Sequence, residues 1–409
     1  MRGRTAGLAA VLALVPVGTA AASNRVAQDW ALPEIRIVTS AGLMGAKTPE
    51  TFRPTANLTD QALANLVFGL QQLLAPPQPA PVVTPAPPPP TTTAPMTTTT
   101  ATTDTTQTTT TAPTTTTVPV TTTAPVTTTT VATPPPPPPA QPPKVADPNA
   151  VATMTMLDAE LVDGVGLSAA AAEYANGARA AGLKIPPRFG TEVAARLLGL
   201  RIDHPAREDE LELLPNDPAT RAEAAYSAAQ IIQSSGWLVP VVQNLADTFS
   251  LPQLSMWQKR ILDTAVARIG MPYVWGGTSD GSEVDFGVPA RGGYDCSGFV
   301  WRVYKLTTYP DEGDLASTLR GRTTYVMSGE VPHSELIDFD HLQPADVLFF
   351  GAKGPNSSPS QVDHMAIYMG NGWFIQSSGY GVAIAQLTGW YRQHFAWARR
   401  PLREAGLSG

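Results

Sequence analysis

The residue best suited to nucleophilic chemistry is Cys296, the single cysteine of the 409-residue chain. The apolar residues Phe299, Val300 and Val303 follow it at helical spacing and predict a helix that begins beside the thiol. Asp295 suits the N-cap of that helix, which places Cys296 in the first turn. There, unpaired N–H groups and the positive end of the helix dipole favour the thiolate. A buried structural cysteine is the alternative interpretation.

A nucleophilic thiolate needs a base, which is usually a histidine. Four of the five histidines lie in an Ala-rich segment, in a polar stretch or close to the end of the chain: His204, His333, His341 and His394. His364 begins a segment that reads as a strand, a turn at Gly370-Asn371-Gly372 and a second strand. Because a strand holds a base more rigidly than a loop does, we predict that His364 serves Cys296.

Other elements must position this pair. From about Leu251 the composition becomes aromatic and Gly-rich, and residues 256–269 have apolar residues at helical spacing. Four blocks then resemble, in the same order, the NlpC-type family of papain-like cell-wall peptidases. They are Pro272–Gly277 (PYVWGG), Asp295–Val300 (DCSGFV), Leu342–Phe350 (LQPADVLFF) and His364–Gly370 (HMAIYMG).

This resemblance covers about residues 254–400. It implies an α+β domain, placed over residues 251–403, with the cysteine helix packed on an antiparallel sheet. It also implies hydrolysis of stem-peptide amide bonds in peptidoglycan, often the bond between D-glutamate and diaminopimelate.

Residue by residue, the resemblance implies that Cys296 is the nucleophile and His364 the general base. It implies that Tyr273 helps the Cys296 backbone N–H to hold the oxyanion. Asp295 and Ser297, which flank the nucleophile, are expected to contribute to the same oxyanion and substrate-binding site. No metal or cofactor is expected, since no metal-ligand cluster is visible in the sequence.

The third polar residue of the family, which orients the base, is often histidine, and the matching position here is Gln376. A glutamine carbonyl can accept from an imidazole N–H, although it cannot stabilise imidazolium as a charge would. The alternative is a polar residue at a strand edge. Since side chains alternate along a strand, a strict two-residue turn would put Gln376 on the face away from His364. We therefore predict an odd-length loop or a bulge that turns Gln376 toward His364.

Two segments are longer than the resemblance requires. Residues 279–293 enlarge the loop before the cysteine, and residues 306–341 form a long polar excursion. We expect both to shape or cover the substrate groove.

The segments before the catalytic region are of different kinds. Residues 1–22 combine a basic start, an apolar stretch and small residues at the end, which is typical of a signal peptide. Residues 76–144 are almost entirely Thr, Pro, Ala and Val, and such a tract cannot bury enough apolar surface to order itself. It is predicted to be a disordered linker, either a plain spacer or a glycosylated stalk.

Residues 24–75 and 145–250 are Ala-rich and predicted to be helical. Three copies of a pattern are discernible, over residues 40–70, 179–200 and 213–232, and Thr59 and Thr220 are each placed to cap the following helix. Glu223, three residues after Thr220, predicts a capping box. The run Pro-Asn-Asp-Pro-Ala-Thr-Arg-Ala-Glu resembles S-layer homology repeats, which implies attachment to cell-wall polymers. A generic helical domain is the alternative.

The net charge of −7 and a charged fraction of 15%, without a basic cluster, argue against nucleic acid as a partner. We therefore predict a secreted, wall-associated cysteine peptidase that acts on peptidoglycan stem peptides. Two alternatives remain open: a non-catalytic wall-binding or scaffold protein with a degenerate peptidase domain, and an acyl-transfer enzyme that uses the same Cys/His pair.

Overall fold

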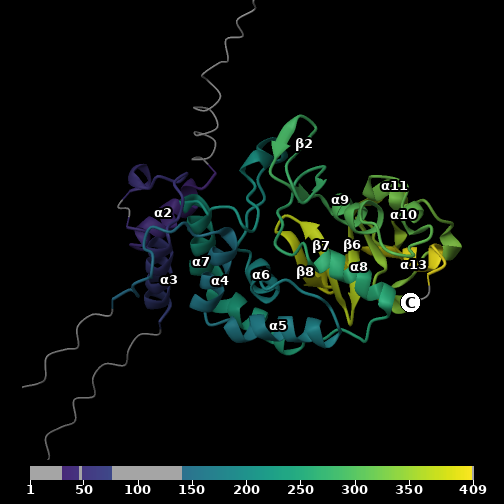
Figure 1. The fold of residues 1–409 in the computed structure, drawn as a ribbon, viewed down its shortest axis with the longest axis horizontal. Helices are drawn as coiled ribbons and strands as arrows, with labels where there is room; N and C mark the ends of the chain where they lie inside the picture. Colours follow the sequence, from purple (N-terminus) through teal and green to yellow (C-terminus); the bar gives the residue numbers. More distant parts are fainter. Residues whose placement is uncertain (1–29, 46–47, 76–140, 408–409) are drawn as a thin grey trace, which may run out of the picture. The chain divides into compact units, whose positions relative to one another are not determined.

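The computed structural model describes residues 30–45, 48–75 and 141–407. The predicted signal peptide and nearly all of the Thr/Pro tract, residues 76–140, lie outside this part of the chain. The described residues up to 75 and those from 142 onward belong to one compact unit (Figure 1). In the described part of the chain, no helix combines the length and the apolar character needed to cross a membrane.

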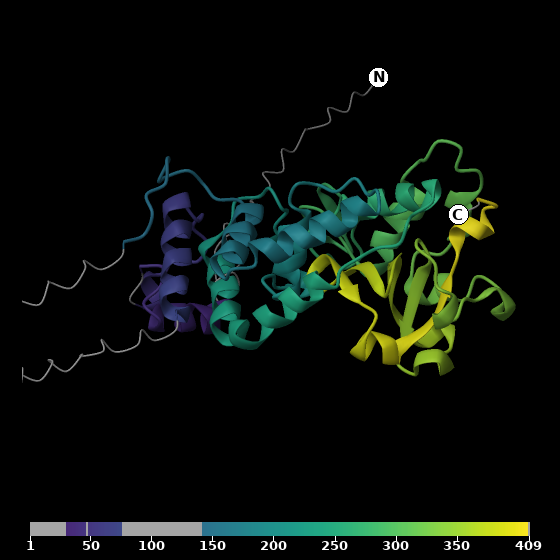
Figure 2. The same cartoon turned by 90° about the horizontal axis from the view of Figure 1, so that it is seen from below.

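The first part of this unit is helical, as predicted. Its α-helices are α2 (Leu32–Ser40), α3 (Asp60–Leu74), α4 (Met154–Gly164), α5 (Ser168–Ala180), α6 (Phe189–Leu197) and α7 (Arg221–Asp247), with a 3-10 helix η2 (Ala206–Leu211) before α7. Helices α2 and α3 pack against α4 and α7, and Figure 2 shows them in purple beside the teal helices. Segments on either side of the Thr/Pro tract therefore share one helical body.

Threonine caps begin three of these helices. Thr59 accepts the N–H of Ala62 at the start of α3, and Thr220 accepts the N–H of Glu223 at the start of α7, as predicted. Thr153 caps α4 in the same way. The capping box predicted at α7 is only half formed, because the Glu223 side chain turns into the interior, where it is 4% exposed.

The three capped helices are joined by a ring of backbone hydrogen bonds. Leu58 N donates to Ala219 O over 2.8 Å, Ala219 N to Ala152 O over 2.9 Å, and Ala152 N to Leu58 O over 3.0 Å. Each of the three segments that form the ring begins with a turn at a proline, five residues before its threonine cap, namely Pro54, Pro148 and Pro215. The ring therefore has three equivalent members, drawn from both sides of the Thr/Pro tract.

The second member of this set differs from the prediction. The second member is the segment 148–153, and not the copy that we inferred over 179–200. Residues 179–200 instead contribute the end of α5 and all of α6. The reason is local: α6 begins at Phe189, so Thr191 lies inside the helix, where its hydroxyl donates to Arg188 O.

The second part of the unit is α+β. Its five-stranded antiparallel sheet has the order β8 (Gly381–Gln386), β7 (Trp373–Ser378), β6 (Val362–Gly370), β5 (Val347–Gly351), β9 (Phe395–Arg399). Short strands β1 (Thr278–Ser279) and β4 (Gly293–Tyr294) pair with each other, as do β2 (Glu283–Asp285) and β3 (Val288–Ala290). The helices are α8 (Met256–Val266), α9 (Cys296–Trp301) with a π-turn to Leu306, α10 (Leu315–Thr318), α11 (Thr324–Ser328), α12 (Gly389–His394) and α13 (Pro401–Glu404).

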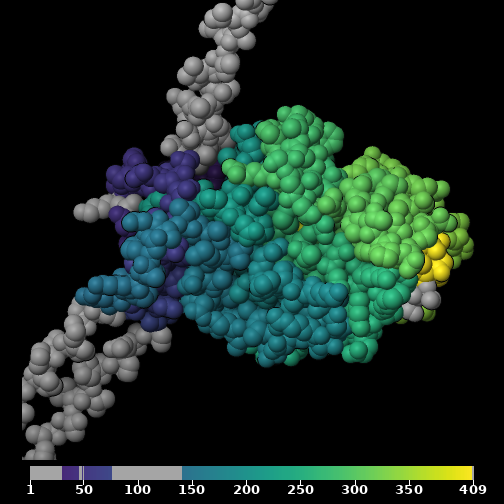
Figure 3. Space-filling model, in the orientation of Figure 1, coloured from purple at the N-terminus to yellow at the C-terminus, as the bar shows by residue number. Residues whose placement is uncertain are grey.

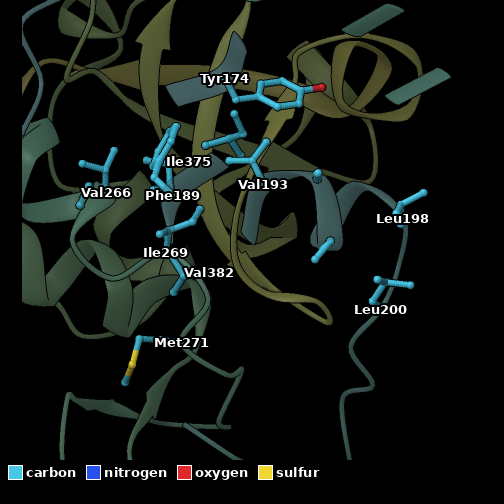
Figure 4. Packing of buried hydrophobic residues seen from close by; sticks show 14 of the residues in the cluster. Tyr174, Phe189, Val193, Leu198, Leu200, Val266, Ile269, Met271, Ile375 and Val382 are labelled. Carbon is cyan, nitrogen blue, oxygen red and sulfur yellow. The ribbon is translucent and has the colours of Figure 1, made fainter. Parts of the chain in front are cut away.

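One apolar core runs through both parts. Tyr174 and Phe189 of the helical part belong to the same buried cluster as Ile375 and Val382 of the sheet (Figure 4). The ring of Trp373 on β7 lies 5.0 Å from that of Phe249. In the space-filling view the teal helical residues lie directly against the green residues of the α+β part (Figure 3). Packing is therefore continuous across residue 250, where we had drawn a domain boundary.

Candidate active site

The thiol of Cys296 lies in the first turn of α9, as the sequence predicts. Asp295 is the N-cap and accepts the backbone N–H of Gly298. A Cβ at Gly298 would lie 1.9 Å from Gly277 O, so only glycine lets α9 approach the preceding loop this closely. Asp295 also accepts the N–H of Gly276 over 3.1 Å. The cysteine helix and the Pro272–Gly277 loop are thus joined through one carboxylate.

The strand pair that carries His364 has the predicted bulge. Gly370 pairs with Trp373 across a two-residue turn, but Tyr368 pairs with Phe374, so Met369 is an extra residue in β6. Asn371 and Gly372 have φ of 50° and 79°, which a primed two-residue turn requires. The extra residue exchanges the faces beyond it, so His364 and Gln376 meet, and the prediction is confirmed.

The two side chains form a close hydrogen bond. Nε2 of His364 lies 2.6 Å from Oε1 of Gln376. Since the amide oxygen can only accept, Nε2 carries the proton and Nδ1 keeps its lone pair. The Gln376 amide nitrogen in turn donates to the hydroxyl of Tyr391 on α12, also over 2.6 Å. The imidazole is thereby held in the tautomer that can act as a base at Nδ1.

The electrostatics of the thiol differ from our expectation. Burial raises the pKa of Cys296 to about 11, and the negative charge of Asp295 acts in the same direction. The N–H groups of Met365 and Ser297 and the Thr324 hydroxyl oppose this shift, but they are outweighed. The helix-start position was therefore a poor guide to the charge, because burial disfavours the charged form of the thiol. The pKa of His364 is lowered, also by burial, so both groups are neutral near pH 7.

The sulfur does not hydrogen-bond to the base in this structure. Among the described residues, the hydrogen bond that Sγ makes is to Thr324 Oγ1, over 3.6 Å. The sulfur nevertheless lies beside the His364 strand, since α9 packs against β6 and β7, and the N–H of Met365 faces the thiol. Cys296 and His364 thus belong to one site, with the thiol turned toward Thr324.

A pocket of about 570 Å³ opens at Cys296. Tyr273 and Trp275 line it from the loop before the cysteine. Burial, followed by the neighbouring Cys296, raises the pKa of Tyr273, so its phenol keeps its proton and can donate a hydrogen bond. The two long segments line the pocket as well, through Phe286 of the β2–β3 hairpin and Tyr325 of the 306–341 excursion. Both therefore shape the groove, as expected.

Sequence reasoning missed Arg322, which lies in that excursion. Its guanidinium donates to Asp295 Oδ1 over 3.2 Å, to Ser297 Oγ over 2.7 Å and to Gly276 O over 2.6 Å. Ser297, expected in the oxyanion and substrate-binding group, is 5% exposed, and its hydroxyl donates to Asp295. The Asp-Cys-Ser turn is therefore braced by a cation, and no spacing in the sequence pointed to it.

A second pocket, of about 500 Å³, lies on the His364 side and shares Tyr273 and Trp275 with the first. Its opposite wall comes from the helical part, through Asp203, His204 and Asp209. Asp209 Oδ2 accepts the backbone N–H of Trp275 over 3.1 Å. His204, which we did not select, pairs with Glu212 over 2.9 Å and is not placed as the base.

Two family models match parts of this chain. The NlpC/P60 family model matches residues 270–400, and the S-layer homology domain model matches residues 24–59. The murein DD-endopeptidase MepH of Escherichia coli is 32% identical over 145 residues, which are 35% of this chain and 45% of that protein. A gamma-D-glutamyl-L-lysine dipeptidyl-peptidase of Bacillus subtilis is 26% identical over 185 residues, 44% of this chain and 51% of that protein.

The chain spans about half the length of these two curated relatives. Among solved structures, an NlpC/P60 family protein from Bacillus cereus is 28% identical over 37% of this chain and 42% of that chain, with a TM-score of 0.27. By the match to the family model, residues 270–400 form an NlpC/P60 domain, in a chain whose residues 24–59 match the S-layer homology domain.

Proposed function

We propose that this protein is a peptidoglycan endopeptidase that cleaves a stem-peptide amide bond with Cys296 and His364. The observation that carries the proposal is the 2.6 Å hydrogen bond from His364 Nε2 to Gln376, on the two strands against which the cysteine helix packs. That bond leaves Nδ1 free to accept a proton. A merely structural histidine has no need of a fixed tautomer beside a buried thiol.

The mechanism follows from two neutral groups. When substrate enters, Sγ turns from Thr324 and gives its proton to His364 Nδ1 as it attacks the amide carbon. The Cys296 N–H and the protonated Tyr273 hydroxyl donate to the oxyanion that forms. The imidazolium then protonates the leaving amine, which departs and leaves a thioester. A water molecule, deprotonated by His364, attacks the thioester, releases the acid and restores the thiol.

The bond that we propose is the one between D-glutamate and diaminopimelate. The two relatives are named for different bonds, one as a DD-endopeptidase and one as a gamma-D-glutamyl-L-lysine dipeptidyl-peptidase. Mass spectrometry of digested muropeptides distinguishes them, because cleavage after D-glutamate releases a fragment with a new amine on diaminopimelate. A digest that yields only fragments cut between two D-centres would overturn this assignment of the bond.

The catalytic roles are tested in the same digest. We expect Cys296→Ala and His364→Ala to abolish cleavage, and Gln376→Ala to lower it less, because it removes an orienting group and leaves the base. Cleavage at the wild-type rate by Cys296→Ala would remove the nucleophile assignment. An added amine such as hydroxylamine tests for acyl transfer, since a transferase would convert the thioester mainly to the hydroxamate.

A scaffold role is the second candidate, and two observations at the thiol favour it. The thiol is hydrogen-bonded to Thr324 rather than to the base, and its pKa is raised to about 11. A scaffold would sediment with insoluble peptidoglycan and release no soluble fragments from it. Release of fragments by the wild-type protein, but not by Cys296→Ala, excludes this role.

We also propose that the protein is exported and held at the wall through the part that matches the S-layer homology domain. The match over residues 24–59 supports binding to a wall polymer. Sedimentation of the intact protein with purified walls, before and after chemical removal of the secondary polymers, tests this proposal. Equal binding to both preparations would show that the polymers are not recognised.

A further inference from the structure

Three aromatic side chains that line the Cys296 pocket are largely exposed. Phe286 is 84% exposed, Trp275 56% and Tyr325 54%. They come from three separate elements, which are the tip of the β2–β3 hairpin, the loop before the cysteine and α11. Exposed apolar groups that gather at a cavity mark a binding surface. The catalytic steps use none of these three side chains, which we call the aromatic rim.

The most exposed ring of the rim, that of Phe286, is held over the catalytic loop. The pairing of β2 with β3 leaves Phe286 and Gly287 as a two-residue turn, with φ of 50° and 88°. A bulky side chain rarely adopts such a conformation, and backbone strain of this kind is concentrated at functional sites. A Cβ at Gly276 would lie 2.6 Å from Cε2 of Phe286, so the ring lies directly against the Gly276 backbone.

The hairpin that carries this ring is braced on two sides. Glu283 Oε1 accepts the N–H groups of Thr278 and Ser279, over 2.9 Å and 3.1 Å. Strand β3 packs against η2, and Arg291, which follows it, lies 3.7 Å from Asp217 of the helical part. The ring is therefore presented to solvent by a supported element.

A stem peptide by itself offers no partner for flat apolar rings. Its side chains are methyl groups, a carboxyl group and the polar chain of a diamino acid. The sugar that carries the stem differs, because one face of a pyranose ring is made of C–H bonds, which pack on the negative face of an aromatic ring. The sugar hydroxyls need hydrogen-bond acceptors, and Asp285, which lines the same pocket, offers carboxylate oxygens.

We propose that the aromatic rim binds the sugar to which the stem peptide is attached, so that the preferred substrate is glycan-linked peptide and not free peptide. The proposal rests on the proposed function of the site. Two residues and a lactyl ether separate that sugar from the bond after D-glutamate, a span of about 10 Å. The pocket of about 570 Å³ contains both Cys296 and the rim, and its volume is in the range of small-molecule sites.

Two substrates that differ only in the sugar test the proposal. One is the disaccharide tetrapeptide, and the other is the same tetrapeptide with an N-terminal lactyl group, which matches the first up to the ether oxygen. We expect KM to be about tenfold lower for the disaccharide compound, since the sugar buries apolar surface on the rim. We expect equal kcat, because this contact is the same in the ground state and the transition state. Equal KM values would overturn the proposal.

Substitutions at the tip of the hairpin assign the effect to the ring. Phe286→Leu keeps an apolar side chain and removes the flat face, so the tenfold difference in KM should shrink by at least about threefold. Phe286→Tyr keeps the face and should keep the difference. The matched control is Trp237→Leu, since Trp237 is 63% exposed on α7, is absent from the pocket lining and should not affect the difference. An undiminished difference in Phe286→Leu would contradict the assignment.

Binding to the Cys296→Ala variant separates the sugar site from the peptidase activity. Isothermal titration calorimetry gives the Kd of both compounds without turnover, and we expect about tenfold tighter binding of the disaccharide compound. That difference, lost in Phe286→Leu/Cys296→Ala, would uphold the sugar site even if the wild type cleaved neither compound, which would reject the proposed function. Cleavage of both compounds with the same KM would uphold the proposed function and reject the sugar site.

Discussion

Arg196 should be among the residues whose loss destabilises the protein most. Its side chain is buried between the helical and the α+β parts, with Nη2 2.7 Å from Glu192 Oε2 and Nη1 3.4 Å from Asp158 Oδ2. It also donates to Gly270 O over 3.0 Å, just after α8 of the α+β part. A Cβ at Gly270 would lie 2.5 Å from the Glu192 carboxylate, so the two parts meet closely here.

Arg196→Met keeps the apolar stem and removes the charge. Asp158 retains Arg201, 3.6 Å away, but Glu192 loses the cation that faces it. Removing one partner of a buried ion pair costs about 3–5 kcal/mol, since the other charge is left without compensation. Burial already raises the pKa of Glu192, so the carboxyl can take up a proton and limit the cost. We expect a loss of about 3 kcal/mol at about pH 8.

The sign of the pH dependence follows from that proton. A carboxyl whose pKa is raised in the folded state binds its proton more readily there than in the unfolded chain, so folding gains stability as the pH falls. The deficit of Arg196→Met should therefore shrink between about pH 8 and about pH 5. Removing the carboxyl charge as well, in Glu192→Gln/Arg196→Met, should recover part of the loss at about pH 8.

Urea unfolding followed by tryptophan fluorescence measures these changes in the free energy of unfolding. The matched control is Arg291→Met, because Arg291 is 54% exposed and lies 3.7 Å from Asp217, so we expect a change of less than about 1 kcal/mol. A deficit below about 1 kcal/mol for Arg196→Met, or one that does not vary with pH, would refute the reasoning. Two separate unfolding transitions in the wild type would show that the parts do not form one cooperative unit.

Two further predictions concern the helical part. Burial raises the pKa of Glu223 to about 7, so ionisation of this carboxyl costs stability as the pH rises above its pKa in the unfolded chain. Glu223→Gln should therefore stabilise the fold by about 1–3 kcal/mol at about pH 8 and not at about pH 4.5. Equal effects of the substitution at both pH values would contradict this. The helical body is built from both sides of the Thr/Pro tract, and Gln61 Nε2 donates to Pro143 O over 3.0 Å. If a protease site is placed within residues 76–140 and cut, the two fragments should therefore elute as one complex in size-exclusion chromatography. Their separation would show that the ring of backbone bonds does not hold the body together.

Much of the candidate site could be predicted from local rules. The helix that begins at Cys296 followed from an N-capping aspartate and apolar spacing, and both depend on residues a few positions apart. An odd-length loop or a bulge in the histidine hairpin followed from the alternation of side chains, because His364 and Gln376, which the resemblance pairs, can meet only if one residue is added between them. The structure has the bulge, at Met369. Such rules act within one or two elements, which is why they can be applied to a sequence alone.

The charge of the site could not be predicted in this way. We expected a thiolate from the helix dipole, whereas burial and Asp295 raise the pKa of Cys296 to about 11. Desolvation depends on every side chain that packs over the sulfur. One of them is Thr324, which lies in the long polar segment 306–341, where the sequence shows no periodic pattern. The sign of the shift was thus set by packing, and local position indicated the opposite.

The sequence by itself determined the cysteine helix, the histidine hairpin and its bulge, since capping and strand parity act over a few residues. Only the tertiary structure decided which distant groups meet there. Asp209 of the helical part accepts from Trp275, 66 residues further along the chain, Arg322 donates to Asp295, and Tyr391 accepts from Gln376. These contacts have no period or fixed spacing, because they arise when separate elements bury their apolar faces in one core and bring their polar side chains together.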